Sequence, residues 1–508
     1  MILLALLHPV LAASNSTPDP WDLIRVDAPD HPDALASSPQ GSVLAAPPSD
    51  AEEWSIESVP EPDGAVLDTV VDERLEEAIG LPAWHDSGYL GQGIKVAVFD
   101  LQWFGSELLE EELGGFSSHD CWASPDCDIP IDSLNPLFDF ERGVHGVACA
   151  EIIHDIAPEA ELFLVRVNGQ TTFENAINWA IREEIDLISM SMTFFNESFY
   201  DGTGPISEPI SRLEEAGILM VTSAGNNAQS HYEDTFRDLN GNGLHEFQNG
   251  WESLPIRAEG GDGRVAAVLW DEFERCGVSD FEITLLDSQG NRIREANSTQ
   301  NFENEKCTPV ERIRAPIELA GDWVYLQIRR KSGPDPMPLD IMSFSGPIWG
   351  AMPQNSMADP APHPHSFSIA AVPVENYLHS DPEVFSSQGP TRGKHFKPDL
   401  AAPDGLSTRS YGLGRFYGTS ASAPVAAGAL AVRLSADPTL SPREAAEDLR
   451  AWAWSGSAQW TGPDPGLGAG RLRLPPLDEV DKQGCASGVL QATLLLLPVF
   501  LLRRTREP

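Results

Sequence analysis

Strand-length apolar runs alternate with runs of helical period through the first half of the chain, and this alternation restricts the folds open to it. The apolar runs are residues 94–100, 161–167, 185–192 and 218–225. Between them, the apolar residues of 172–184 and 206–217 recur with the period of a helix. This order predicts an α/β unit, a parallel sheet covered by helices. Functional groups in such sheets gather at the carboxyl ends of strands, and Asp100 and Asn226 lie at such ends.

The pattern changes between residues 231 and 345. Four short strand-like runs follow one another there, with no long helical pattern between them: 265–271, 281–288, 291–297 and 322–330. We interpret this stretch as an inserted antiparallel β-sandwich. Because the mixed pattern then resumes, the α/β unit is predicted to comprise two parts, residues 79–230 and 346–475.

The two ends of the chain have compositions unlike that of a folded core. Residues 1–13 are apolar and end in small residues, as a signal peptide does. Residues 14–78 are rich in Pro, Ala, Ser and Asp, which predicts a flexible or propeptide-like leader. Residues 476–508 contain Cys485, an apolar run and then arginines. This run is marginal for a membrane span and resembles the C-terminal sorting signals of myxobacterial surface proteins, so we expect a secreted or surface-held protein, anchored through this segment or released from it.

The charge balance excludes one class of partner. The chain carries 33 Lys and Arg residues against 77 Asp and Glu residues, a formal net charge of −44. Such a protein repels a phosphate backbone, so nucleic-acid binding is not expected.

The cysteines favour an oxidising compartment. Cys121 and Cys127 flank a short polar loop, and Cys276 and Cys307 lie in one segment of the predicted sandwich. Two local disulfides are therefore predicted, as in exported proteins. Cys149 has no obvious partner, and a small buried apolar residue is favoured over a reactive thiol at this position.

A serine with the setting of a nucleophile lies in residues 418–431, GTSASAPVAAGALA. Ser420 follows a flexible Gly-Thr turn and opens an alanine-rich helix, where backbone N–H groups and the helix dipole favour developing negative charge. A hydroxyl is a weak nucleophile by itself, so the site requires a base and a carboxylate that orients the base.

Residues 418–424, GTSASAP, resemble the active-site serine box of the subtilisin-like serine proteases, or subtilases. VHGVACAEI at 144–152 resembles their histidine box and IKVAVFD at 94–100 their aspartate box, in the family's order. Residues 386–405 resemble the segment that leads to the serine, and VTSAGNN at 221–227 resembles the segment of the oxyanion-hole asparagine. The resemblance implies a subtilisin-like three-layer fold over about residues 80–230 and 346–475.

The resemblance also implies the roles of four residues. Ser420 would attack the scissile carbonyl, His145 would transfer its proton, and Asp100 would orient the imidazole. Asn226 would donate from its side-chain amide to the oxyanion. No catalytic metal is required. Taken singly, each residue has an ordinary alternative as a turn, cap or core residue, and it is their occurrence together and in order that favours the catalytic interpretation.

The family's pattern is altered at several positions beside these residues. Leu101 and Gln102 follow Asp100 where a small hydroxyl residue and a glycine are usual. Val147 stands for a threonine, and Glu151 for a glycine. None of these changes removes a proton-transfer group.

Two further sites are suggested by the sequence. Ser191, Met192 and Thr193 resemble the strand that lines the substrate's main-chain cleft, and Thr193 replaces a glycine beside the first specificity pocket. The spacing of oxygen ligands in residues 238–246 is that of half a calcium loop, although a turn rich in Asp and Asn explains it nearly as well. The candidate calcium ligands are Asp238, Asn240, Asn242 and Glu246.

We therefore expect an exported, monomeric serine endopeptidase that cleaves proteins or peptides through an acyl-enzyme. The alternative from another class is a catalytically impaired subtilase-fold protein that binds proteins or glycans at the cell surface. The complete set of Asp100, His145 and Ser420 favours the enzyme, and the altered residues after Asp100 favour the alternative.

Overall fold

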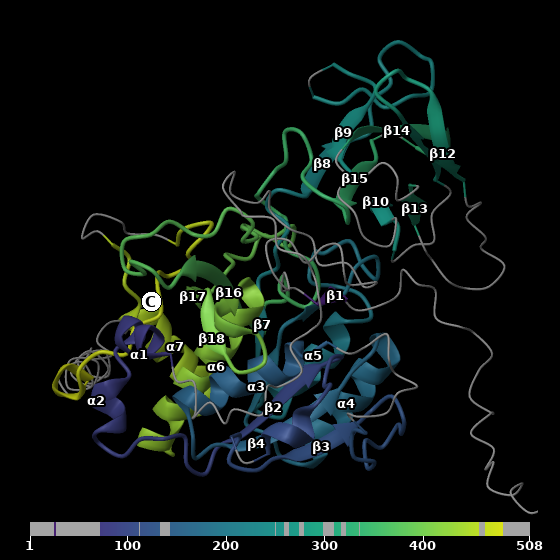
Figure 1. Ribbon diagram of the computed structural model, residues 1–508. Helices are drawn as coiled ribbons and strands as arrows, with labels where there is room; N and C mark the ends of the chain where they lie inside the picture. The colour runs from purple at the N-terminus through teal and green to yellow at the C-terminus, as the bar shows by residue number, and fades with distance from the viewer. Residues whose placement is uncertain are drawn as a thin grey trace, which may run out of the picture.

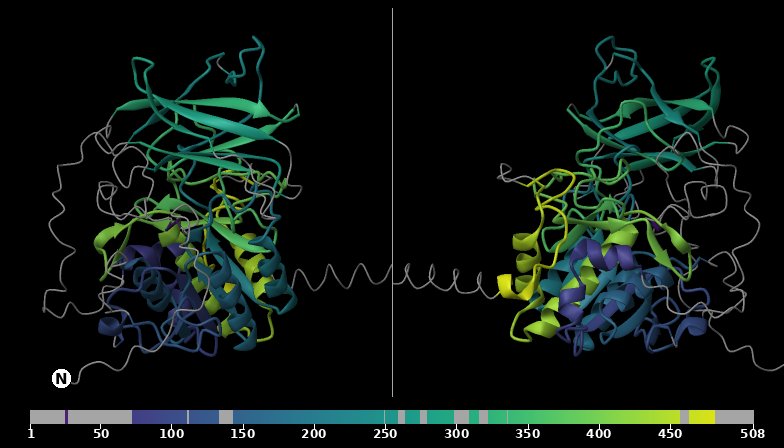
Figure 2. Two further views of the ribbon diagram at one scale, coloured as in Figure 1. Left: turned by 90° about the vertical axis from the view of Figure 1, so that its right-hand side faces the viewer. Right: turned by 60° about the vertical axis from the view of Figure 1, so that its left-hand side comes forward.

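The computed structural model describes residues 72–110, 112–132, 143–248, 250–258, 264–273, 279–297, 309–315, 322–334, 336–456 and 463–480, and the backbone of residues 25 and 26. Figure 1 shows an α/β unit with a body of antiparallel strands above it. The rotated views in Figure 2 show the same two bodies, the α/β unit and the antiparallel strands above it.

The α/β unit is built on a seven-stranded sheet in which every neighbouring pair is parallel. The strands, in their order across the sheet, are β17 (Leu400–Asp404), β16 (Ser366–Pro373), β7 (Leu219–Ser223), β5 (Leu187–Met190), β2 (Lys95–Asp100), β4 (Glu161–Arg166) and β3 (Ser117–Asp120). This arrangement confirms the predicted fold class.

Helices cover both faces of this sheet because its strand residues point alternately to two cores. Val96 and Val98 of β2 join a core with α3 (His145–Ile156) and α6 (Thr419–Ala436). Ala97 and Phe99 join the opposite core, with α4 (Gln170–Arg182) and α5 (Ser207–Glu215). Alternation of this kind is what a buried parallel strand requires.

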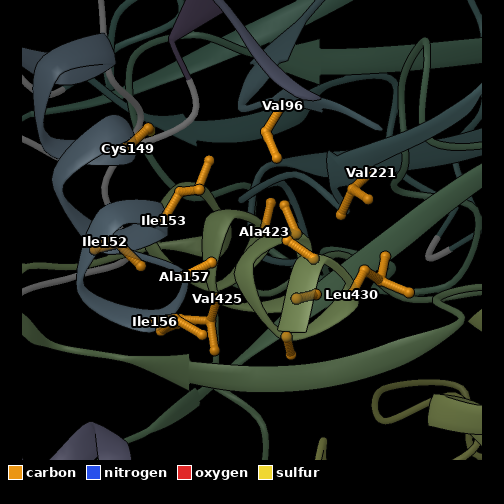
Figure 3. Close-up of a cluster of buried hydrophobic side chains, with 14 of the residues drawn as sticks. Val96, Cys149, Ile152, Ile153, Ile156, Ala157, Val221, Ala423, Val425 and Leu430 are labelled. Carbon is orange, nitrogen blue, oxygen red and sulfur yellow. The ribbon is translucent and has the colours of Figure 1, made fainter. Parts of the chain in front are cut away.

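The close packing of α3 on α6 depends on a glycine. A Cβ atom on Gly428 would lie 2.8 Å from the Cβ of Ile156. Figure 3 shows this core, with Ile152, Ile153 and Ile156 of α3 in the same cluster as Val425 and Leu430 of α6. Close contact matters here, because α3 begins at His145 and α6 begins beside Ser420.

The remaining helices of the described residues are short or peripheral. They include α1 (Glu73–Ile79), α2 (Pro82–His85), η2 (Ser106–Leu109) and α7 (Pro442–Trp452). Helix α1 begins at Glu73, so the ordered part of the chain starts within the predicted leader. Leu75 and Ile79 form the buried face of this helix and hold it against the rest of the fold. Asp72 caps its start and Gly80, with φ of 77°, caps its end.

The strands between β7 and β16 form two four-stranded antiparallel sheets. One contains β13 (Val310–Arg314), β10 (Arg264–Trp270), β15 (Pro338–Ser343) and β8 (His231–Thr235). The other contains β12 (Arg292–Ala296), β11 (Asp280–Leu286), β14 (Trp323–Ser332) and β9 (Leu254–Arg257). Val268 of one sheet and Phe281 of the other belong to one buried core, so the two sheets form the predicted sandwich.

Two small antiparallel pairs complete the fold. Strands β18 (Leu406–Thr408) and β19 (Gly412–Phe416) form a hairpin that precedes α6. Strand β6 (Met192–Thr193) pairs with β1 (Arg25–Val26).

The disulfide Cys121–Cys127 is present, as predicted. The predicted pair Cys276–Cys307, Cys485 and the apolar segments at both ends lie outside the described residues. No helix in the described parts of the chain combines the length and the apolar character needed to cross a bilayer.

Candidate active site

Asp100 and His145 form a completely buried pair. Asp100 ends β2 and His145 is the first residue of α3, so the sheet edge and the start of the helix bring them together. His145 Nδ1 lies 2.6 Å from Asp100 Oδ2, and both side chains have 0% exposure. The second oxygen, Asp100 Oδ1, accepts the backbone N–H groups of Leu101 at 2.8 Å and Gln102 at 2.9 Å. The altered residues after Asp100 therefore still orient its carboxylate.

The other nitrogen of His145 is available for proton transfer. Nδ1 faces the Asp100 carboxylate, whereas Nε2 is buried and has no hydrogen-bond partner among the described residues. The ring of Phe416, from β19, lies edge-on to the imidazole at a centroid distance of 5.6 Å. The arrangement leaves Nε2 as the acceptor of a proton while Nδ1 donates to Asp100.

Ser420 is buried near the start of α6, where the sequence predicts the nucleophile. Its hydroxyl donates to the carbonyl of Ser191 at 3.3 Å, and the hydroxyl of Ser191 donates to the carbonyl of Ser420 at 3.0 Å. These reciprocal bonds join Ser420 to the residue immediately before β6. The hydroxyl of Ser420 is thus directed to Ser191 and not to His145 in this state.

Cys149 lies close to both the histidine and the serine. Its Sγ is 3.7 Å from the carbonyl oxygen of Ser420, and it groups with Asp100 and His145, all three offering side-chain atoms within 4.8 Å of one another. Burial, and secondly the charge of Asp100, raises the pKa of the Cys149 thiol well above its usual value. A protonated, buried thiol agrees with the predicted role as a small apolar residue.

Asn226 follows β7 and is held beside Ser420 by Thr419. The Oδ1 atom of Asn226 accepts the backbone N–H of Thr419 at 3.1 Å and its hydroxyl at 2.9 Å. The Thr419 hydroxyl also accepts the backbone N–H of Gly225 at 3.2 Å. Thr419 was not predicted from the sequence, although its place directly before the predicted nucleophile is a usable signal.

Glu151 is the second residue of this region that the sequence left without a role. It lies on α3 and is buried, and its two carboxylate oxygens accept the backbone N–H groups of Arg409 at 3.0 Å and Ser410 at 3.3 Å. Both residues belong to the turn of the β18–β19 hairpin. Glu151 therefore joins the histidine-bearing helix to the hairpin that precedes Ser420.

The predicted substrate strand pairs with another strand of the chain. Met192 and Thr193 form β6, and they pair with Val26 and Arg25 in the antiparallel sense. A backbone segment from elsewhere in this chain thus adds a strand to β6, which is the mode of binding expected for an extended peptide.

The predicted calcium loop has the hydrogen bonds of an Asp- and Asn-rich turn. Asp238 accepts the N–H groups of Gly241, Asn242 and Gly243, and Glu246 accepts those of Leu239 and Asn240. Glu252, which was not predicted, accepts from the side-chain amides of Asn240 and Asn242. A calcium ion would have to share oxygens that already accept N–H groups, and calcium binding here stays a prediction.

The chain is similar to known proteins over its α/β unit. The model of the Subtilase family matches residues 132–247 and 341–470, which include His145, Asn226 and Ser420 and begin after Asp100. Subtilisin E of Bacillus subtilis (strain 168) is 28% identical over 165 residues, which are 30% of this chain and 39% of the relative. The major intracellular serine protease of the same organism is 29% identical over 163 residues, which are 30% of this chain and 48% of the relative. The match thus spans less than half the length of these relatives.

Among solved structures, the CspB protease of Clostridium perfringens superposes with a TM-score of 0.55 at 15% identity, covering 80% of this chain and 99% of that one. The fold is subtilisin-like. The family match and these relatives agree with the resemblance to subtilisin-like serine proteases that the sequence motifs indicate.

Proposed function

We propose that the protein is an exported serine endopeptidase in which Asp100, His145 and Ser420 act as a catalytic triad. The observation that carries the proposal is the fully buried Asp100–His145 pair, at 2.6 Å, whose free nitrogen lies in the same region as a serine at the start of α6. A buried carboxylate that fixes the tautomer of an imidazole is the arrangement needed to make a serine hydroxyl nucleophilic.

In this mechanism the hydroxyl of Ser420 turns from the Ser191 carbonyl to His145 Nε2, which takes its proton as Oγ attacks the substrate carbonyl. Hydrogen bonds of this kind are commonly long or misaligned in a free enzyme and tighten with substrate. The Asp100 carboxylate then stabilises the imidazolium, which donates its proton to the leaving amine. Water completes the cycle by hydrolysing the acyl-enzyme on Ser420.

The oxyanion would receive a hydrogen bond from the side-chain amide of Asn226 and one from the backbone N–H of Ser420. Thr419 supports this role, because its two hydrogen bonds engage Oδ1 of Asn226 and so direct the amide group the other way. Removing one donor of an oxyanion hole costs about 100- to 1,000-fold in turnover.

Substrates would be unfolded proteins or peptides that bind β6 as an added antiparallel strand. Support comes from the pairing of β1 with the same edge. Export is supported by the disulfide Cys121–Cys127 and by the sequence of residues 1–13.

The test compares the purified protein with a Ser420→Ala variant. Both are treated with a fluorophosphonate probe that reacts with activated serines, and both receive unfolded casein, with and without calcium. Labelling and cleavage by the wild type alone support the proposal. A folded wild type that neither labels nor cleaves contradicts it and favours a binding protein.

A further inference from the structure

Residues 356–361, which follow the sandwich, lie between the two parts of the chain that hold substrate in the proposed function. On one side, the N–H of Phe194, directly after β6, donates to the carbonyl of Asp359 at 2.7 Å. On the other side, Met357 and Ala361 pack with Ala224, just before Asn226. A peptide whose main chain pairs with β6 and whose carbonyl reaches Asn226 directs the side chain before the cut toward this segment.

The carboxyl group of Asp359 is buried here without a cationic partner in its hydrogen bonds. Its exposure is 0%, and the hydroxyl of Ser198 donates to Oδ2 at 2.5 Å. Oδ1 has no hydrogen-bond partner among the described residues. Burial and then the negative charges of Asp201 and Glu197 raise the pKa of Asp359 to about 7. A buried carboxyl in a negative field is stabilised in its ionised form by a cation.

Asn196, in the loop between β6 and α5, is a second buried group without a partner. It is 4% exposed, and neither the oxygen nor the nitrogen of its amide has a hydrogen-bond partner within the part of the chain that the structure describes. The backbone is in the left-handed region, with φ of 69° at Asn196 and 55° at Tyr200. The Tyr200 hydroxyl accepts the N–H of Asn196, so the strained loop is held in place. Buried polar atoms without partners call for a ligand or another explanation.

The loop that contains Asn196 also contacts the carboxyl of Asp359, through Ser198. The N–H of Tyr200 donates to the hydroxyl of Ser198, and that hydroxyl donates to Asp359. The loop after β6, which contains Asn196, and the segment after the sandwich, which contains Asp359, are therefore hydrogen-bonded to each other beside β6.

We propose that Asp359 and Asn196 bind the substrate side chain that precedes the scissile bond, and that they select substrates with arginine or lysine at this position. The inference rests on the proposed function and adds its substrate class. The cationic head group would donate to Asp359 Oδ1 and to the amide oxygen of Asn196. Arginine, with five donors in a planar group, can satisfy both acceptors at once.

The experiment uses the full chain and two fluorogenic peptides that differ only in the residue before the cut. One carries arginine and the other citrulline, which has the same shape without the charge. We expect kcat/KM for the arginine peptide to exceed that for the citrulline peptide by about 10-fold or more, because a buried polar site discriminates strongly against a substrate that cannot pair with it. Cleavage sites mapped by mass spectrometry in casein should follow Arg and Lys.

An Asp359→Asn variant should bring the arginine-to-citrulline ratio close to one while fluorophosphonate labelling persists. Glu208→Gln, which removes an exposed carboxylate from α5, is the matched control and should leave the ratio unchanged. If Asp359→Asn fails to fold, the ratio for the wild type still decides. A wild type that labels and cleaves casein without preferring arginine overturns the inference and leaves the proposed function intact. A wild type that does not label overturns both.

Discussion

At the scale of single residues, the candidate site depends on a hydroxyl that touches no substrate. Thr419 is fully buried, and its hydroxyl donates to Asn226 Oδ1 and accepts the N–H of Gly225. The residue before the proposed nucleophile thus fixes the orientation of the residue proposed to bind the oxyanion. A side chain of the same shape without the hydroxyl leaves both partners buried and less well satisfied.

Thr419→Val should therefore lower kcat about 10-fold with little change in KM, since the oxyanion forms only after substrate has bound. Thr419→Ser keeps the hydroxyl and should restore most of the activity. Steady-state kinetics on one peptide substrate, with thermal melting of each variant, measure the effect. Equal kcat values for the valine and serine variants would show that the Thr419 hydroxyl does not contribute to catalysis.

At the scale of elements, α3 and the β18–β19 hairpin are joined through a buried carboxyl. Burial first, and then the charge of Glu112, raises the pKa of Glu151 from 4.5 to about 8, although two backbone N–H groups donate to its oxygens. Burial and the charge of Glu151 likewise raise the pKa of Asp155, one turn along α3, to about 8. At a pH between the ordinary carboxyl pKa and about 8, Glu151 and Asp155 therefore hold protons in the folded protein that they release in the unfolded chain.

Because the folded state binds more protons than the unfolded chain over this range, the free energy of unfolding should fall as pH rises from about 5 to 8. Glu151→Gln cannot ionise, so its stability should fall less over the same range. Glu159→Gln, at an exposed position just after α3, is the control and should keep the slope of the wild type. Urea titrations at several pH values give the slopes. Parallel slopes for wild type and Glu151→Gln would show that Glu151 does not hold the proton.

The elements themselves were predictable because their patterns are local. In β2, Val96 and Val98 face one core and Ala97 and Phe99 face the other, which is the pattern of a buried strand. The alternation of such strands with helices along the chain predicts a parallel sheet. The site residues were predictable where they belong to short motifs. Thr419 and the partners of Asp359 were not, because each acts through a contact with a residue distant in the sequence. The role of Glu151 shows the same limit, since its partners follow it by more than 250 positions.

At the scale of the whole molecule, the sandwich is attached to the subtilisin-like unit by an apolar cluster and a buried ion pair. Phe195 and Phe199 of the loop after β6 pack with Leu269 and Met342 of the sandwich. Arg392, from the segment that leads to Ser420, forms an ion pair with Asp340 of β15. Its guanidinium carbon Cζ lies 4.4 Å from the centroid of the Phe199 ring. The loop that carries Asn196 is therefore fixed from both bodies.

The ion pair itself lies almost entirely out of water. The Arg392 side chain is 13% exposed and that of Asp340 is 0% exposed, and Glu233 of β8 adds a second carboxylate at 3.1 Å from the guanidinium. Burial opposes ionisation of Asp340, but Arg392 and His231 nevertheless hold its pKa below the usual value. Asp340 is thus a charged group whose solvation has been replaced by these two partners.

Arg392→Met should therefore cost about 3–5 kcal/mol, because it leaves a buried carboxylate with only His231 beside it. The double variant Arg392→Met, Asp340→Leu should regain part of this loss, since it removes the uncompensated charge as well. Arg292→Met, which breaks an exposed pair on β12, is the control and should cost no more than about 1 kcal/mol. Urea denaturation followed by tryptophan fluorescence compares the three variants. If Arg392→Met loses no more stability than Arg292→Met, the apolar cluster alone attaches the sandwich, and the buried charges only determine how it is oriented.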